Sequence, residues 1–340
     1  MLEYVNEIKM GRRHRSFAVQ GAMPLGSWRL SVHADREYYT DSLKRHFKQQ
    51  LGTMPHSGHA DVCLYMLEAP DSVFGFTKAA AAMENQAASW QPVRDGIYTL
   101  FTGWFRVTVL TRRVPLEVVL LIREPQYTRE AFHGHLFEIM HKLLFLFERL
   151  YVHAGAVALN DQACMFVGDR GSGKSTACMR LAQAGPVILS DDHVVVKRSL
   201  GKFYVSGCEA YGRVTEKTER ELLPRTLDAP LKDYNGLRKK EFRVADFFPC
   251  AHYQDHPLKQ IFFTRVRDDF LIVPLSPQAT TIRLIQTTRP FFRASGKAEF
   301  EDYLTYCSEL AREVSAFDLT LSQNLETLDE LEQFLNEGCE

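Results

Sequence analysis

The chain has 340 residues, 45% of them hydrophobic and 24% charged, with a formal net charge of −1. This composition is ordinary for a soluble globular protein, includes no low-complexity tract and supplies enough apolar material for a sizeable core. A net charge near zero gives no reason to expect a nucleic acid or an anionic membrane as partner.

Cysteine usage and the apolar segments bear on the compartment. Seven cysteines are scattered without a C-x-x-C pair, which favours a reducing environment over a disulfide framework. The N-terminal segment lacks the apolar core of a signal peptide, and the apolar run 143–147 is too short to cross a bilayer. We therefore expect a cytoplasmic protein.

Residues 1–127 predict a small α+β domain. Four stretches have strand-like composition, between loops rich in glycine, proline and serine: 27–33, 62–67, 98–109 and 116–122. An alanine-rich segment, 78–88, predicts a short helix. No motif for chemistry stands out, so substrate recognition is a hypothesis that rests on β-rich composition alone.

Residues 128–340 predict a second domain, which begins after Glu124-Pro125. Apolar side chains at helical spacing between Phe132 and Leu150 predict a buried helix near its start. Two β-prone runs then flank Asn160-Asp161, a dipeptide typical of hairpin turns.

The segment after this hairpin, GDRGSGKST, has the spacing G-x-x-x-x-G-K-[ST] of a phosphate-binding loop. Its glycines allow backbone N–H groups to approach phosphate oxygens, and the following helix directs its positive end to the same point. Lys174 could contact the β and γ phosphates, and Ser175 could bind Mg²⁺. The residues expected to bind ATP are Gly168, Asp169, Gly171, Ser172, Gly173, Lys174, Ser175 and Thr176. Arg170 is left out, because an exposed loop arginine is usually solvated.

The strand-like segment VILSDD ends in Asp191 and Asp192. Its place, after a strand, the glycine loop and a helix over 175–184, is where a phosphate-binding loop needs a carboxylate for Mg²⁺. Two adjacent carboxylates can divide the work, one on the metal and one as base. A coincidental glycine turn and an Asp-Asp turn that caps a strand are the bland alternatives, and this context favours the functional interpretation.

The continuation HVVVKRSLGKFYVSG predicts a second hairpin where parallel α/β ATPases have a crossover helix. A histidine at a strand start, a hairpin, the glycine loop, a helix and Asp-Asp before another hairpin together resemble the HPr kinase/phosphorylase fold, shared with ATP-dependent phosphoenolpyruvate carboxykinase. The resemblance covers about residues 128–320. It implies an α/β domain with a mixed sheet and hairpins around the phosphate-binding loop.

The resemblance also implies roles for individual residues. Lys174 would steady the transferring phosphate, and Ser175 with Asp192 would hold Mg²⁺. Asp191 would take the proton from the attacking serine hydroxyl. His153 would lie beside Asp191 and orient it or tune its pKa.

The segment SGCEAYGRVTEK does not match the glycine-rich signature that supports dephosphorylation in bifunctional members of that family. The other motifs of the chain are similar to those of shorter HPr-kinase-like proteins linked to peptide natural products such as lasso peptides. The prediction is therefore an ATP- and Mg²⁺-dependent kinase that acts on a serine of a peptide or small protein. A carboxykinase-like phosphotransferase for a small metabolite and a non-catalytic nucleotide-gated binding protein stay as alternatives. The oligomeric state is left open, a homo-oligomer included.

Weaker signals lie in the last third of the chain. The basic segment 235–243 predicts a loop that either binds phosphate or is simply solvated, with candidates Arg238, Lys239, Lys240 and Arg243. Arg265 and Arg267 follow a predicted strand and could also point to the site. Cys250, His252 and His256 have spacing compatible with a metal, although a loop without metal is favoured.

Overall fold

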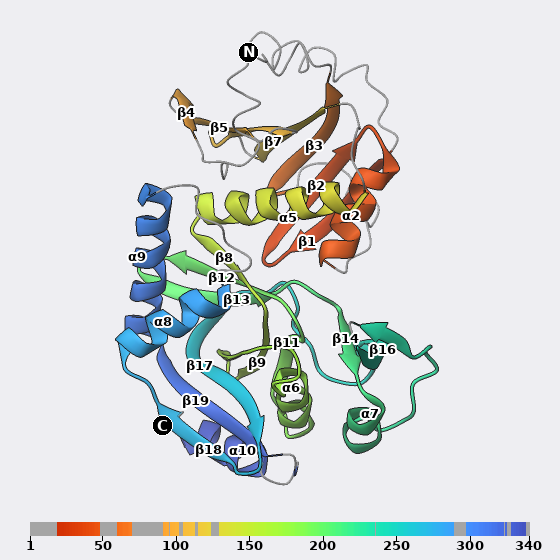
Figure 1. Ribbon diagram of the computed structural model, residues 1–340, viewed down its shortest axis with the longest axis vertical. Helices are drawn as coiled ribbons and strands as arrows, with labels where there is room; N and C mark the ends of the chain where they lie inside the picture. Colours follow the sequence, from red (N-terminus) through yellow and green to blue (C-terminus); the bar gives the residue numbers. More distant parts are fainter. Residues whose placement is uncertain are drawn as a thin grey trace. The chain divides into compact units, whose positions relative to one another are not determined.

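The computed structural model describes residues 19–47, 60–69, 91–94, 96–101, 105–112, 115–123, 129–234, 236–288, 297–322, 324 and 328–337 (Figure 1). Contacts divide the chain into two compact units. The larger one holds Leu25–Ser27, Glu138–Arg293 and Glu301–Glu340. None of the helices in the described part has the length and apolarity that crossing a membrane requires.

The described strands of the smaller unit form one mixed sheet in the order β1-β2-β3-β7-β6-β5-β4. They span Val19–Leu25 (β1), Trp28–Ala34 (β2), Val62–Ala69 (β3), Gln91–Arg94 (β4), Ile97–Phe101 (β5), Phe105–Leu110 (β6) and Leu116–Arg123 (β7). Strands β2, β3 and β7 run parallel, and β7, β6, β5 and β4 follow antiparallel. Helix α2 (Glu37–Phe47) packs against β2.

The stretch 98–109, expected as one strand, is two. Strands β5 and β6 pair with each other, with Leu100 opposite Val107, and both side chains are buried. Folding the run back on itself places apolar residues of both strands in the core. The alanine-rich helix expected over 78–88 lies outside the described residues.

The larger unit contains a second mixed sheet, with described strands in the order β11-β9-β10-β17-β13-β12-β8, with β19 also paired to β17, and with β18 on the other side of β19. These strands span Arg149–Val152 (β8), Ala154–Leu159 (β9), Gln162–Val167 (β10), Val187–Ser190 (β11), Val194–Ser199 (β12), Lys202–Gly207 (β13), His256–Arg267 (β17), Leu271–Pro274 (β18) and Ser315–Ser322 (β19). The expectation of a mixed sheet with hairpins is confirmed. At the β9–β10 turn Asn160 and Asp161 both have positive φ, as the tightest hairpin turns require.

Strand β17 organises this sheet. It pairs in parallel with β10 on one side and β19 on the other, while its first residues pair with β13. Most of its residues from Leu258 to Thr264 are buried, which suits a strand covered on both faces. Because β10 and β17 are parallel, their carboxyl ends meet at one edge of the sheet.

Helices of the larger unit cover this sheet (Figure 1). They are α6 (Lys174–Gln183), α8 (Pro277–Thr288), α9 (Lys297–Glu313) and α10 (Leu328–Glu337), while α5 (Arg129–Leu146) precedes β8 in the chain and belongs to this unit from Glu138 on. Helix α6 packs on β9 and β10 through buried side chains that include Ala177, Cys178 and Leu181. This burial fixes the start of α6 close to the carboxyl end of β10, across the glycine loop that joins them.

A separate three-stranded sheet follows β13, in the order β14-β16-β15. Its strands span Tyr211–Val214 (β14), Lys232–Tyr234 (β15) and Leu237–Arg243 (β16), and helix α7 (Glu216–Leu222) lies between β14 and β15 in the chain. The basic segment 235–243, expected as a loop, is therefore largely strand. Opposite charges on paired residues support it, since Arg213 Nε lies 3.2 Å from Glu241 Oε2 across the β14–β16 pair.

Candidate functional site

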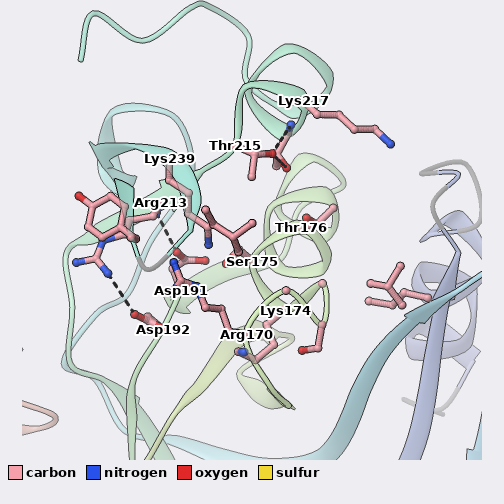
Figure 2. Close-up of a pocket in the computed structure, with 18 of the residues that line it drawn as sticks. Arg170, Lys174, Ser175, Thr176, Asp191, Asp192, Arg213, Thr215, Lys217 and Lys239 are labelled. Carbon is pink, nitrogen blue, oxygen red and sulfur yellow. Dashed lines mark hydrogen bonds and ion pairs between the residues drawn. The ribbon is translucent and has the colours of Figure 1, made fainter. Parts of the chain in front are cut away.

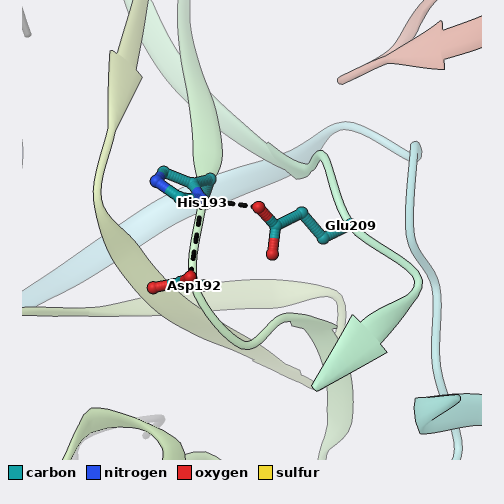
Figure 3. A group of neighbouring side chains, drawn as sticks. All are labelled: Asp192, His193 and Glu209. Atoms are coloured by element: carbon teal, nitrogen blue, oxygen red, sulfur yellow. Dashed lines mark hydrogen bonds and ion pairs between the residues drawn. The ribbon is translucent and has the colours of Figure 1, made fainter. Parts of the chain in front are cut away.

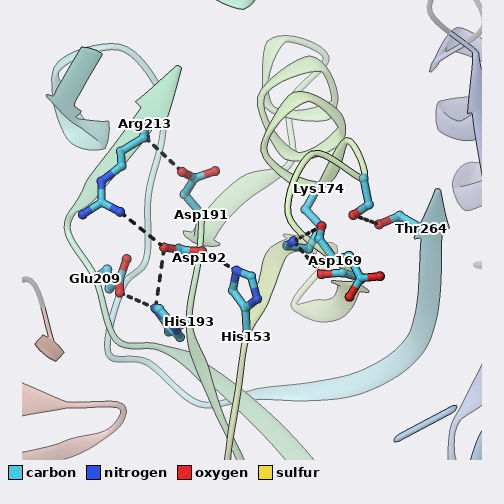
Figure 4. Close-up of polar contacts among 11 residues, drawn as sticks. His153, Asp169, Lys174, Asp191, Asp192, His193, Glu209, Arg213 and Thr264 are labelled. Atoms are coloured by element: carbon cyan, nitrogen blue, oxygen red, sulfur yellow. Dashed lines mark hydrogen bonds and ion pairs between the residues drawn. The ribbon is translucent and has the colours of Figure 1, made fainter. Parts of the chain in front are cut away.

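The glycine loop lies between β10 and α6 and is tethered to the neighbouring strand β17. Ser172 Oγ lies 2.8 Å from Thr264 Oγ1, and Thr264 Oγ1 donates to the carbonyl of Val167. A Cβ atom at Gly168 would lie 2.6 Å from the carbonyl oxygen of Thr264, so the first position of the loop accepts only glycine. The parallel pairing of β10 and β17 thus builds the base of the loop (Figure 4).

Lys174 is the first residue of α6 and is almost fully buried. Its ammonium donates to the carbonyls of Gly168 (2.7 Å) and Asp169 (3.0 Å), at the base of the same loop. Burial lowers the pKa of Lys174, while the nearby carboxylates of Asp191 and Asp192 oppose that shift. A buried ammonium whose partners are neutral carbonyls would gain from an anionic ligand in the loop.

The two aspartates follow β11 and have different partners. Asp191 is buried, and its Oδ2 accepts a hydrogen bond from the backbone N–H of Arg213 (3.0 Å). Asp192 is partly exposed, and its Oδ1 lies 2.6 Å from His153 Nε2. Figure 4 shows both carboxylates between Arg213 on one side and the glycine loop on the other.

The position of His153 corrects the sequence-based interpretation, which placed it beside Asp191. The reason is strand register: β8 pairs with β12 so that Val152 is opposite Val194. Continued by one residue, this antiparallel register sets His153 opposite His193. The ring of His153 then meets Asp192, the residue before His193. Burial is the main cause that lowers the pKa of His153, and the hydrogen bond to Asp192 opposes it.

A second histidine contact lies behind Asp192 (Figure 3). His193 Nδ1 is 2.5 Å from Oε1 of Glu209, whose side chain is fully buried, and 3.8 Å from Asp192 Oδ2. These three residues offer ligand atoms within 4.8 Å of one another. Among the described residues, Cys250, His252 and His256 do not form such a group, and His252 Nδ1 instead meets the carbonyl of Leu189 (2.8 Å).

A cavity of about 600 Å³ opens over the loop and the aspartates (Figure 2). The predicted residues that line it are His153, Gly171, Ser172, Gly173, Lys174, Ser175, Thr176, Asp191 and Asp192. Gly168 and Asp169 lie at the base of the loop and do not line it, whereas Arg170 does. The opposite wall comes from the β14–β16–β15 region and includes Arg213, Tyr234 and Lys239.

The alternation of side chains along a strand decides which of the basic residues proposed to contact phosphate reach the cavity. Successive side chains of β16 point to opposite faces, so Lys239 reaches the cavity while Lys240 pairs with the buried Glu219 (3.0 Å). Burial lowers the pKa of Lys239, and Asp191 and Asp192 oppose this. On β17, Val266 lines the cavity, and Arg265 instead donates from Nε to Thr320 Oγ1 (3.0 Å).

Sequence reasoning missed Arg213, Tyr234 and Thr264. Thr264 could have been predicted, because it ends a predicted apolar strand and the carboxyl ends of parallel strands share an edge. Arg213 and Tyr234 stand in short segments with no motif, and only the pairing of β14, β15 and β16 brings them to the cavity.

Comparisons with known proteins give a distant similarity. No family model matches the chain. A segment of 62 residues, 18% of this chain, is 36% identical to HPr kinase/phosphorylase of Mycoplasmopsis pulmonis (strain UAB CTIP), and the match spans about a fifth of that relative's length. The HPr(Ser) kinase/phosphatase from Coxiella burnetii aligns in structure over 55% of this chain and 95% of its own, with 8% identity and a TM-score of 0.30.

Proposed function

We propose that this protein is an ATP- and Mg²⁺-dependent kinase that transfers the γ-phosphate to a serine-type hydroxyl of a peptide or small protein. The observation that carries the proposal is that Lys174, Asp191 and Asp192 line one cavity. Lys174 begins the helix that follows the glycine loop, and the two aspartates follow β11. The distant sequence similarity to HPr kinase/phosphorylase suggests a kinase-like function and agrees with it.

The cavity fits a nucleotide in size and chemistry. About 600 Å³ is within the range of small-molecule sites, and one end is formed by the glycine loop and the N-terminus of α6. Gly171 has a φ of +80° and open space where a Cβ would stand, so phosphate can approach its backbone. Lys174 would exchange the two loop carbonyls for phosphate oxygens.

The donor set near Lys174 fits Mg²⁺. Ser175 and Asp192 both line the cavity and offer the oxygen ligands that this ion prefers. His153, which is bonded to Asp192 Oδ1, would orient that carboxylate. When bound, Mg²⁺ would neutralise charge on the β and γ phosphates.

Asp191 is the proposed general base. Its buried carboxylate is held by the Arg213 N–H, and it lines the same cavity as Lys174. Asp191 would accept the hydroxyl proton as the oxygen attacks the γ-phosphorus. The neighbouring Asp192, with a different hydrogen-bond partner, is left to the metal.

The acceptor class is tested by following labelled γ-phosphate from ATP with Mg²⁺ into a panel of serine-containing peptides, natural-product precursor peptides among them, and into host lysate. We expect label on a peptide or protein. Label on a small metabolite alone would replace this proposal with a carboxykinase-like reaction. Tight ATP binding without any transfer or hydrolysis would replace it with a nucleotide-gated binding protein.

A further inference from the structure

Arg213 has three side-chain contacts, of which Figure 2 shows the one with Asp192. Its Nε lies 3.2 Å from Glu241 Oε2, and the centre of its guanidinium lies 4.3 Å from the centroid of the Tyr234 ring. Its Nη1 lies 3.9 Å from Asp192 Oδ2, on the cavity side. The aromatic ring and the ion pair at Nε restrict the guanidinium, and Nη1 lies beside Asp192, another residue that lines the cavity.

This placement puts a permanent positive charge opposite Lys174. Lys174 reaches the cavity from the glycine loop, and Arg213 reaches it from β14. The two aspartate carboxylates lie between them (Figure 4). The same residue also holds Asp191 through its backbone N–H, so β14 fixes the proposed base and the guanidinium together.

An arginine that only forms a structural ion pair with Glu241 would not need to reach the cavity beside Asp192. The contact with Glu241 already satisfies charge across the β14–β16 pair, and a distance of 3.9 Å to Asp192 is too long for a hydrogen bond. Nη1 is therefore positioned beside the Asp192 carboxylate without a hydrogen bond to it. A planar guanidinium at the wall of a cavity is suited to bind phosphate oxygens.

We propose that Arg213 is a further catalytic residue, which donates hydrogen bonds to the transferring phosphoryl group, and that Tyr234 and Glu241 are positioning residues for it. This inference rests on the proposed kinase function. In the step, the acceptor oxygen forms a bond to the γ-phosphorus, and the bond from that phosphorus to the β,γ-bridging oxygen breaks. The hydroxyl proton moves to Asp191, ADP leaves, and Arg213 stays protonated throughout while it stabilises charge on the three equatorial oxygens.

The first test is the steady-state kinetics of Arg213→Ala and Arg213→Lys. We expect kcat to fall about 100- to 1,000-fold in Arg213→Ala, the usual loss for one preorganised donor to a transition state, with KM for ATP changed less than about threefold. Arg213→Lys keeps the charge and side-chain length, and we expect it to recover only part of kcat. Added guanidinium ion should restore activity to Arg213→Ala and leave the wild type unchanged.

The matched control is Arg225→Ala. Arg225 also stacks on an aromatic ring, 5.0 Å from the centroid of Phe247, but it does not line the cavity. We expect its kcat to stay within about twofold of the wild type, because loss of a stacked surface arginine removes no contact with the phosphoryl group. Tyr234→Leu should lower kcat less than Arg213→Ala does, with guanidinium ion giving no rescue.

The second test does not depend on turnover. Binding of ADP with aluminium fluoride, a mimic of the transferring phosphoryl group, is compared with binding of ADP alone. We expect Arg213→Ala to weaken the first at least about tenfold more than the second, because transition-state mimics gain most from residues that contact the transferring group.

The outcomes separate this inference from the function on which it rests. A wild type that transfers no phosphate would remove the proposed function. An active wild type together with an equally active Arg213→Ala would remove only the role of Arg213. Equal losses of affinity for ADP and for ADP with aluminium fluoride would also overturn that role, because they would indicate a ground-state or structural contribution.

Discussion

The Nε2 atom of His153 lies 2.6 Å from Oδ1 of Asp192, whereas the adjacent Asp191 is held by the backbone N–H of Arg213. Two neighbouring carboxylates thus have different hydrogen-bond partners, one between β8 and β9 and the other on β14. Asp192 is partly exposed beside an imidazole, and Asp191 is buried beside a fixed amide. This difference is the physical basis for assigning one to the metal and the other to the proton.

Asp192→Asn should raise the Mg²⁺ concentration needed for half-maximal ATP binding by at least about tenfold, because a charge-bearing oxygen ligand is replaced by a neutral one. A Mg²⁺ titration of ATP binding measures this. Asp191→Asn is the matched control, and its titration should coincide with the wild type within about threefold. Equal shifts in the two variants would contradict the division of roles.

Lys174→Met should weaken ATP binding by about 10- to 100-fold, the loss expected for a charge-assisted contact worth about 1.5–3 kcal/mol. ADP binding should weaken less, because the ammonium is proposed to reach the γ-phosphate. Calorimetry with both nucleotides measures the difference. Lys202→Met changes an exposed lysine on β13 and should leave both affinities unchanged. Loss of ADP and ATP affinity in equal measure would argue against a γ-phosphate contact.

Gly173→Ala should destabilise the fold more than Gly201→Ala. Both glycines have positive φ, +93° and +73°, which costs an alanine about 1 kcal/mol. At Gly173 a Cβ would also lie 2.6 Å from Cδ1 of the buried Leu321, and this overpacking adds about 1 kcal/mol or more, whereas Gly201 has open space. Denaturant unfolding of the two variants measures the difference. Equal free energies of unfolding would contradict close packing of the loop against β19.

Acid should destabilise the folded chain in part through His252. Burial is the main cause that lowers the pKa of His252 below its ordinary value of 6.5. As pH falls through 6.5, the unfolded chain binds a proton that the folded chain does not, so the free energy of unfolding falls. His252→Asn can still donate to the Leu189 carbonyl but does not titrate, and should lose less stability between about pH 7 and pH 5. Unfolding curves across this range with the same pH slope as the wild type would rule out this contribution.

Much of the larger unit follows from local sequence signals. Asn160-Asp161 and the Ser-Leu-Gly turn predicted the two hairpins, and both are present. The glycine loop was expected between a strand and a helix, and it lies between β10 and α6. These features depend on residues close together in the chain, which is why the pattern reveals them.

The features that sequence reasoning missed depend on pairing between distant segments. Strand β16 has a charged sequence typical of a loop, and it is a strand because Arg213 and Val214 pair with Glu241 and Lys240. The contact between His153 and Asp192 follows from the β8–β12 register, which no motif encodes. Resemblance to a family placed His153 in the site beside Asp191, whereas its hydrogen bond in the structure is with Asp192.

The most direct test of the central claim is a comparison of Asp191→Asn with the wild type in two assays, ATP binding and transfer of labelled γ-phosphate to a serine acceptor. The account predicts that Asp191→Asn binds ATP with Mg²⁺ within about threefold of the wild type and loses transfer by about 100-fold or more, because a positioned base contributes that much. Transfer that persists at the wild-type rate in Asp191→Asn would contradict the account.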